Sequence, residues 1–381
     1  MVMTRREALI GGGAATGISF AGGAPAQTPT LMRTMVQDLV SIPDLEIAAK
    51  HVMNHKAYEF VASGAGDEHT LKWNIEAYAK ILLRPRILVD VAKTNTEVSL
   101  FGRTLPSPVL LAPTAYHRLY HPDGELATAR GAGAAGATYV VSTNTNTRIE
   151  DIARVATAPL WFQLYIQSDR GFTKDVVERV QAAGCRALCL TVDTPTGGAR
   201  NRQQKAKFNL PPSLSTPYMD DRNRRLRNAA GGDRPTATWK DVEWLRSFTK
   251  VPLLLKGVMT GEDARRGVAE GAAGIIVSNH GGRNLDGLPA TINALPEVVS
   301  AVGAQLPVLV DGGIRRGTDV VKAIALGARA VLIGRPYLYG LAVGGADGVS
   351  HALSLLDREL RMALMLLGRP SISRVDRSVL W

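Results

Sequence analysis

Eight short apolar runs, alternating with stretches of helical spacing, constrain the fold of this 381-residue chain more than any other feature. The runs are continuously apolar, which is typical of strands buried on both faces of a parallel sheet. Successive β-α units of this number predict a (β/α)8 TIM barrel that forms one domain over residues 27–381. The expected strands are 109–112, 139–142, 160–164, 187–192, 253–256, 274–278, 308–311 and 330–334. Helices are expected at 124–135, 173–183, 262–271, 289–302 and 318–326, among others.

Two segments stand outside this regular pattern. Apolar residues recur at helical spacing from Ile42 to Ser63, and Gly64 closes the segment, so a helical extension is expected before the barrel. A long loop, 194–238, follows the fourth expected strand and contains the basic run Arg222 to Arg227. This loop is interpreted as a lid over the barrel mouth whose arginines contact a membrane surface, or as a solvated insertion without a role.

The first residues have the features of an export signal. Arg5 and Arg6 precede a weakly apolar Gly/Ala-rich run from Ile10 to Ala24, and Ala24-Pro25-Ala26 is a small-x-small cleavage pattern. Residues 1–26 resemble a twin-arginine signal, which predicts export to the bacterial periplasm. The alternative is a flexible arm that is not cleaved.

Composition narrows the classes of ligand. The net charge of +11 favours an anionic substrate, a phosphate cofactor or a membrane surface. Basic residues are scattered and aromatics make up only 6%, so nucleic acid is not expected. Cys185 and Cys189 lie too far apart along one expected strand for a disulfide. No Cys-x-x-Cys or His-Glu-x-x-His motif is present, so no metal is expected.

Polar residues follow nearly every expected strand. In a barrel these strand ends share one mouth, where active sites lie. After the sixth strand, the run Ser278 to Asp286 places a potential base, His280, three residues from a fixed cation, Arg283. This pair suits the binding of a carboxylate by Arg283 and the removal of a proton by His280. The alternative is a glycine turn in which both side chains are solvated and have no role.

The run 278–286 resembles the signature of the FMN-dependent 2-hydroxy acid oxidase and dehydrogenase family. That family includes glycolate oxidase, lactate oxidase, mandelate dehydrogenase and flavocytochrome b2. The similarity extends from about residue 42 to residue 368. Further matching stretches are 62–65, 111–115, 162–165, 190–195, 255–258, 311–319 and 333–336.

The resemblance implies FMN as cofactor and a site at the barrel mouth. Gly313 and Arg315, with Gly334 and Arg335, would hold the phosphate at the ends of strands seven and eight, the usual barrel phosphate site. Lys256 would stabilise negative charge on the flavin. The full set of implied cofactor residues is Pro113, Thr114, Ala115, Ser142, Gln163, Thr191, Lys256, Ser278, Asp311, Gly313, Arg315, Gly334 and Arg335.

The same resemblance implies oxidation of an (S)-2-hydroxy acid to the 2-keto acid. His280 would be the base, oriented by Asp193, while Arg200 and Arg283 bind the carboxylate and Tyr165 the substrate oxygen. Electrons would pass to oxygen, or to a cytochrome or quinone, and a homotetramer is implied by analogy.

Three positions depart from the family pattern. Asn284 replaces the usual Gln of the signature, Phe60 replaces a Tyr that helps to bind the carboxylate, and Asn144 stands where glycolate oxidase has Trp. Phe60 and Asn144 touch the expected substrate pocket, so a larger or more polar substrate than glycolate is inferred. The alternatives are a tolerant pocket for ordinary small hydroxy acids, another FMN-dependent reaction such as isomerisation, and a non-catalytic flavin-binding barrel.

Overall fold

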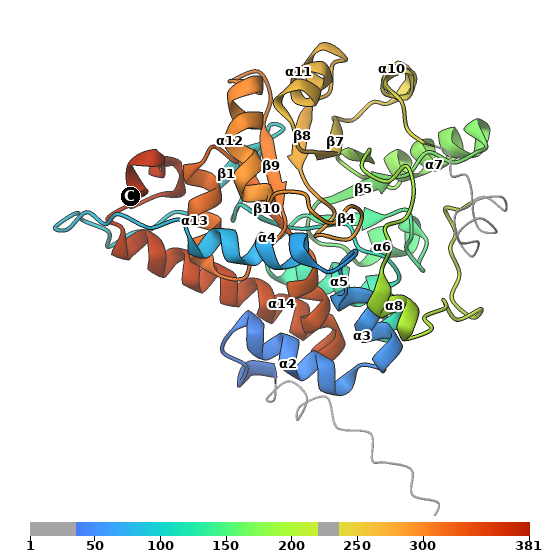
Figure 1. Ribbon diagram of the computed structural model, residues 1–381, viewed down its shortest axis with the longest axis horizontal. Helices are drawn as coiled ribbons and strands as arrows, with labels where there is room; N and C mark the ends of the chain where they lie inside the picture. Colours follow the sequence, from blue (N-terminus) through green and yellow to red (C-terminus); the bar gives the residue numbers. More distant parts are fainter. Residues whose placement is uncertain (1–35, 220–235) are drawn as a thin grey trace, which may run out of the picture.

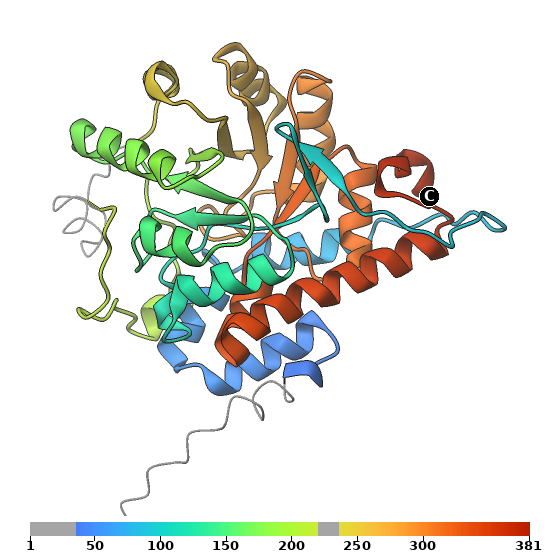
Figure 2. The same ribbon diagram turned by 180° about the vertical axis from the view of Figure 1, so that it is seen from behind.

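The computed structural model describes residues 36–219 and 236–381 (Figures 1 and 2). The expected signal, residues 1–26, and the basic run 222–227 lie outside these residues. Within the two described ranges, no helix is long and apolar enough to cross a membrane.

Eight parallel strands close into a barrel, and each coincides with one of the predicted apolar runs. The last strand pairs with the first, with Val331 opposite Val109, which confirms the predicted fold. The strand interiors are fully buried, as their continuous apolarity requires. In chain order the barrel strands are β3 (Val109–Leu111), β4 (Tyr139–Ser142), β5 (Leu160–Leu164), β6 (Leu188–Thr191), β7 (Leu253–Val258), β8 (Gly274–Val277), β9 (Val308–Asp311) and β10 (Ala330–Ile333).

Helices surround the barrel (Figure 1). Figure 2 shows the last of them running beside α5 along one side of the molecule, and it is interrupted at Gly344 and Gly345, where the backbone is not helical. Cys185 and Cys189 are buried as free thiols. The outer helices are α5 (Gly124–Ala134), α6 (Ile149–Val155), α7 (Arg170–Ala182), α10 (Trp239–Phe248), α11 (Gly261–Ala269), α12 (Thr291–Val302), α13 (Gly317–Ala325) and α14 (Arg335–Leu366).

A hairpin covers the amino-terminal end of the barrel. Its strands are β1 (Val98–Leu100) and β2 (Arg103–Leu105), which pair antiparallel. At its tip Phe101 contacts Trp161 at the start of β5, with ring centroids 5.7 Å apart. Because this end is closed by apolar side chains, the opposite end is the open mouth.

The expected extension 42–63 is two helices rather than one continuous helix. They are α2 (Ile42–Val52) and α3 (His55–Ala62), and the break at Met53 and Asn54 corrects the prediction. Asn54 caps α3, because its side-chain oxygen accepts a hydrogen bond from the Lys56 N–H at 2.9 Å. The apolar spacing continues across this cap, so periodicity alone did not reveal the turn.

The next helix, α4 (His69–Ala79), ties the extension to the loop after β8. Its amino-terminal end is capped by Asp286, whose carboxylate accepts from the backbone N–H of Asp67 at 2.9 Å and of Thr70 at 2.8 Å. Within the same contact, Asn74 and Asn279 exchange two amide hydrogen bonds of 2.9 Å. These bonds fix the loop that carries His280 and Arg283.

Candidate active site

A cavity of about 450 Å³ opens at the carboxyl ends of the barrel strands. Two of the residues predicted for the site, Asp193 and Ser278, lie behind the wall of this cavity. The others all line it: Phe60, Pro113, Thr114, Ala115, Ser142, Asn144, Gln163, Tyr165, Thr191, Arg200, Lys256, His280, Arg283, Asp311, Gly313, Arg315, Gly334 and Arg335. Residues scattered over 276 positions of sequence therefore meet at one mouth, as the barrel topology predicts.

His280 and Asp193 form a hydrogen-bonded pair. The His280 Nδ1 lies 3.1 Å from Asp193 Oδ1 and 3.3 Å from Oδ2. Burial lowers the pKa of His280 below its ordinary value of 6.5, and the nearby cations Lys256 and Arg200 lower it further, although Asp193 opposes this. Burial would raise the pKa of Asp193, but the charges of His280 and Lys256 outweigh it and hold that pKa low. At neutral pH the pair is a neutral imidazole held by a carboxylate, which is the arrangement of a general base.

The unusual residue Asn284 supports the pair from behind. Its side-chain amide donates a hydrogen bond of 2.9 Å to the backbone carbonyl of Asp193. The amide of Asn284 therefore joins the loop after β8 to the loop after β6.

The backbone around His280 is strained. His280, Gly281 and Gly282 have φ values of 58°, 64° and 73°, in the left-handed region. A Cβ at Gly282 would lie 2.7 Å from the Leu71 backbone nitrogen of α4. This glycine makes room for the neighbouring helix.

Buried cations gather on one side of the cavity. Arg283 donates to the Ser63 carbonyl at 2.8 Å, and Arg335 donates to the carbonyls of Val61, Ser63 and Gly281 at 2.9–3.0 Å. Burial lowers the pKa of Arg283 well below its ordinary range, and Arg200 and Arg335 lower it further. In the described part of the chain, every hydrogen bond of these two arginines goes to a backbone carbonyl. A cavity wall of this kind favours an anionic ligand.

Lys256 of β7 and Asp311 at the end of β9 form a buried ion pair on either side of β8, the strand before Arg283. Lys256 Nζ lies 3.2 Å from Asp311 Oδ2 and donates to Ser278 Oγ at 3.0 Å. Burial opposes the charge of Lys256, but Asp311 and Asp193 overcome it, so its pKa is raised and it remains a cation. The Ser278 hydroxyl accepts the hydrogen bond from Lys256, so in this structure Ser278 fixes the position of Lys256.

Several groups beside this ion pair suit a polyhydroxylated phosphorylated ligand such as FMN. Asp311 Oδ1 is buried and has no hydrogen-bond partner among residues 36–219 and 236–381, so it can accept from a ribityl hydroxyl. Gly312 and Gly313 follow it with φ values of 97° and 82°, and they line the same part of the cavity as Arg315 and Gly334. The residues present therefore fit the cofactor that the motifs imply.

A row of hydrogen-bonded side chains lies along β4, β5 and β6 at the cavity. Gln163 donates to Thr191 Oγ1 at 2.9 Å and accepts from Ser142 Oγ at 3.1 Å. All three groups are nearly fully buried. Each partner fixes the next, so the row presents a rigid polar edge to a flat ligand.

Aromatic residues that the sequence analysis did not single out complete the mouth. Phe208 of the long loop stacks on Phe60 with ring centroids 4.5 Å apart, and Tyr116 lies against the same ring at 5.7 Å. Tyr120 also lines the cavity. Tyr116 and Tyr120 follow the first predicted strand end, which could have marked them, whereas nothing in the pattern around Phe208 does.

A second missed group fixes the segment after β3. The Thr114 hydroxyl is 2.7 Å from His117 Nε2 and also bonds the Tyr337 hydroxyl. His117 is fully buried, and burial lowers its pKa. These partners set the position of Thr114 at the cavity wall.

The fold and this mouth define a class of protein: an α/β-barrel enzyme with an anion-binding wall, a buried base and a place for a phosphorylated cofactor. Residues 49–381 match the model of the family described as FMN-dependent dehydrogenase. The chain belongs to this family, and its cofactor is FMN.

Similarity to related enzymes covers nearly the whole chain. An L-lactate oxidase of Nostoc sp. is 46% identical over 362 residues, covering 91% of this chain and 99% of the relative. A peroxisomal (S)-2-hydroxy-acid oxidase of Oryza sativa subsp. japonica is 47% identical over 347 residues, covering 89% and 95%. Among solved structures, mandelate oxidase with benzoyl-formic acid is similar with a TM-score of 0.83 and 44% identity, covering 88% of this chain and 96% of that one.

Proposed function

We propose that this enzyme oxidises an (S)-2-hydroxy acid to the 2-keto acid, with His280 as base and Arg200 and Arg283 as the carboxylate site. The observation that carries the proposal is the hydrogen bond between His280 and Asp193, close to the buried guanidinium of Arg283. The named activities of the lactate, 2-hydroxy-acid and mandelate oxidases support it.

Each residue has a step in the proposed reaction. The substrate carboxylate binds the Arg200 and Arg283 side of the cavity, which places C2 near His280. Burial raises the pKa of Tyr165 to about 12, so its phenol stays protonated and donates to the substrate oxygen. Oxidation of the alcohol to the ketone releases two electrons and two protons. His280 takes one proton, and Asp193 stabilises the imidazolium. FMN, when bound, would accept the two electrons together with the second proton, and Lys256 would provide a fixed positive charge beside it.

The first test is anaerobic titration of the flavin-loaded enzyme with a panel of (S)-2-hydroxy acids, followed by visible absorbance. Bleaching is expected for the wild type, and His280→Ala should slow it by about 10²–10⁴-fold while retaining the flavin. Because the base must be neutral and burial lowers its pKa below 6.5, kcat/KM should rise with pH, reach half its maximum below pH 6.5, and then level off. A wild-type flavin that no hydroxy acid bleaches would refute the proposal, and equal bleaching in the variant would refute the role of His280.

Oxygen is the proposed electron acceptor. Two curated relatives are named oxidases, and Ala115, which resembles the residue of the oxidases, lines the cavity. Rapid recolouring when air enters the bleached sample is the expected result, whereas slow recolouring indicates a cytochrome or quinone instead.

The substrate pocket should respond to restoring a hydroxyl at position 60. The Phe60 ring lines the cavity, with Arg283 Cζ 5.3 Å from its centroid. A hydrogen bond to a charged group contributes about 1.5–3 kcal/mol, so Phe60→Tyr should lower KM for a small hydroxy acid by about ten- to a hundredfold. Steady-state kinetics with two substrates of different size measures this. An unchanged KM for both would show that this position does not face the carboxylate.

We further propose export to the periplasm through the twin-arginine pair Arg5 and Arg6, an inference supported by the sequence alone. Lysine at both positions should leave the protein in the cytoplasm of a bacterial host, as measured by cell fractionation. Equal periplasmic yield would contradict the proposal.

A homotetramer is also proposed from the family resemblance. Exposed apolar residues at one edge of the molecule support an association surface: Ile87, Leu88, Leu366 and Trp381. Light scattering gives the assembly directly.

A further inference from the structure

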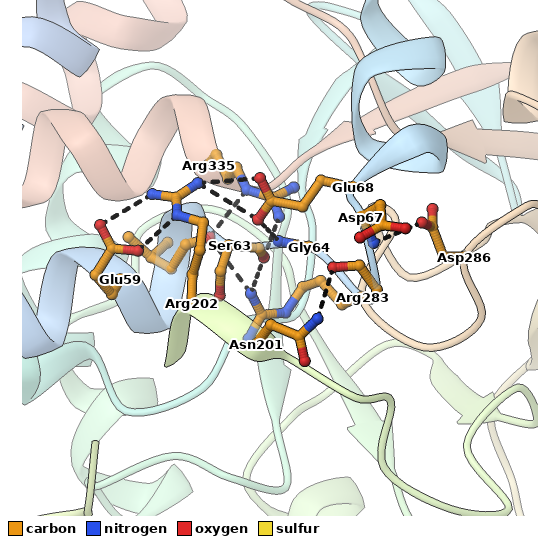
Figure 3. Close-up of polar contacts among 12 residues, drawn as sticks. Glu59, Ser63, Gly64, Asp67, Glu68, Asn201, Arg202, Arg283, Asp286 and Arg335 are labelled. Atoms are coloured by element: carbon orange, nitrogen blue, oxygen red, sulfur yellow. Dashed lines mark hydrogen bonds and ion pairs between the residues drawn. The ribbon is translucent and has the colours of Figure 1, made fainter. Parts of the chain in front are cut away.

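A cluster of Glu59, Glu68 and Arg202, called here the Arg202 clamp, joins three segments beside the mouth (Figure 3). Arg202 Nη2 donates to Glu59 Oε1 at 2.9 Å, and Arg202 Nε forms an ion pair with Oε2 at 2.8 Å. Arg202 Nη1 reaches both Glu68 oxygens at 3.3–3.4 Å. The clamp spans α3, the turn before α4 and the loop after β6, and the catalytic proposal does not use it.

On one side the clamp holds α8 (Asn201–Lys205), which begins directly after Arg200. A helix of five residues has little stability of its own, so its position depends on what it packs against. Besides Arg202, the anchors are Asn201, whose amide donates to the Gly66 carbonyl at 3.2 Å, and the Ala199 carbonyl, which accepts from Gly66 N–H at 2.8 Å. Figures 1 and 2 both show α8 lying beside α3.

On the other side the clamp reaches Arg283. Glu68 Oε1 also accepts from the Gly64 N–H at 2.8 Å, which holds the turn after Ser63. The Ser63 carbonyl in turn accepts from Arg283 at 2.8 Å. Figure 3 shows this continuous route from Arg202 through Glu68 to the buried guanidinium.

Arg200, directly before α8, and Arg283 carry like charges that repel each other. Arg200 is close enough to Arg283 to lower the pKa of Arg283, and Arg200 Nε donates to the Arg283 carbonyl at 3.2 Å. The two clamp carboxylates, Glu59 and Glu68, both contact Arg202, two residues after Arg200. Two like charges that must face one substrate carboxylate need an external support of this kind.

We propose that Arg202 is a positioning residue that sets the spacing of Arg200 and Arg283 around the substrate carboxylate. This inference rests on the proposed function. Arg202 touches neither substrate nor cofactor in this scheme, and it acts through the backbone of α8 and the Ser63–Gly64 turn. Loss of the clamp should weaken carboxylate binding more than it slows the chemical step.

The test compares Arg202→Met with Arg179→Met in the flavin-loaded enzyme. Arg179 is a matched control, because it makes a similar two-bond contact with Glu150, at 2.7–2.9 Å, and its side chain is 42% exposed against 40% for Arg202. Arg202→Met should raise KM by about tenfold with kcat changed less than about threefold. Arg202→Lys should recover part of the loss, and Arg179→Met should match the wild type.

Binding of a non-reacting carboxylate separates this inference from the proposed reaction. Pyruvate and benzoylformate are titrated against the flavin absorbance, and the Arg202→Met Kd should rise by about the same factor as KM. Equal Kd and KM in the Arg202 and Arg179 variants would overturn the inference, as would a loss of flavin or thermal stability that accounts for the whole effect. If no hydroxy acid reduces the wild type, the reaction proposal fails, and the Kd comparison alone still decides the role of Arg202.

Discussion

Closure of the parallel sheet between β10 and β3 is the constraint on which the rest of the molecule depends. Because the strands form one closed parallel sheet, the carboxyl ends of all eight lie at one rim. Residues far apart in the sequence can therefore form a single site. The rim receives His280, the proposed base, from the β8 loop, its partner Asp193 from the end of β6, and Lys256 from β7. The hairpin β1–β2 fills the other end, so ligands enter from one side.

Electrostatics then distinguishes two kinds of cation on this rim. Lys256 and Asp311 satisfy each other, which keeps a buried lysine charged. On the neighbouring strand ends Arg283 and Arg335 donate to neutral carbonyls, so the described structure places no carboxylate on them. In the proposed reaction the substrate carboxylate supplies this missing partner for Arg283.

Much of this arrangement could be read from the sequence, and the reasons are local. Continuous apolar runs identify buried strands, and glycines beside His280 and Asp311 mark strained turns at their ends. The break at Asn54 was missed because a cap interrupts the backbone without interrupting the apolar spacing. Arg202 and Glu59 are 143 residues apart, and nothing in either segment indicates that they meet. The bond between Ser278 and Lys256 joins two strand ends, and neither position in the sequence shows that the two side chains meet.

The close packing of Gly282 against α4 has a consequence for how such a pocket can change. The β8 loop cannot accept a larger side chain there, and its polar contacts, Asn279 with Asn74 and Asp286 with the backbone of Asp67 and Thr70, fix it to the same helix. Phe60, Asn144 and Phe208 come from other segments and take no part in those contacts. Substitutions at these three positions can therefore reshape the pocket without displacing the loop that carries His280 and Arg283.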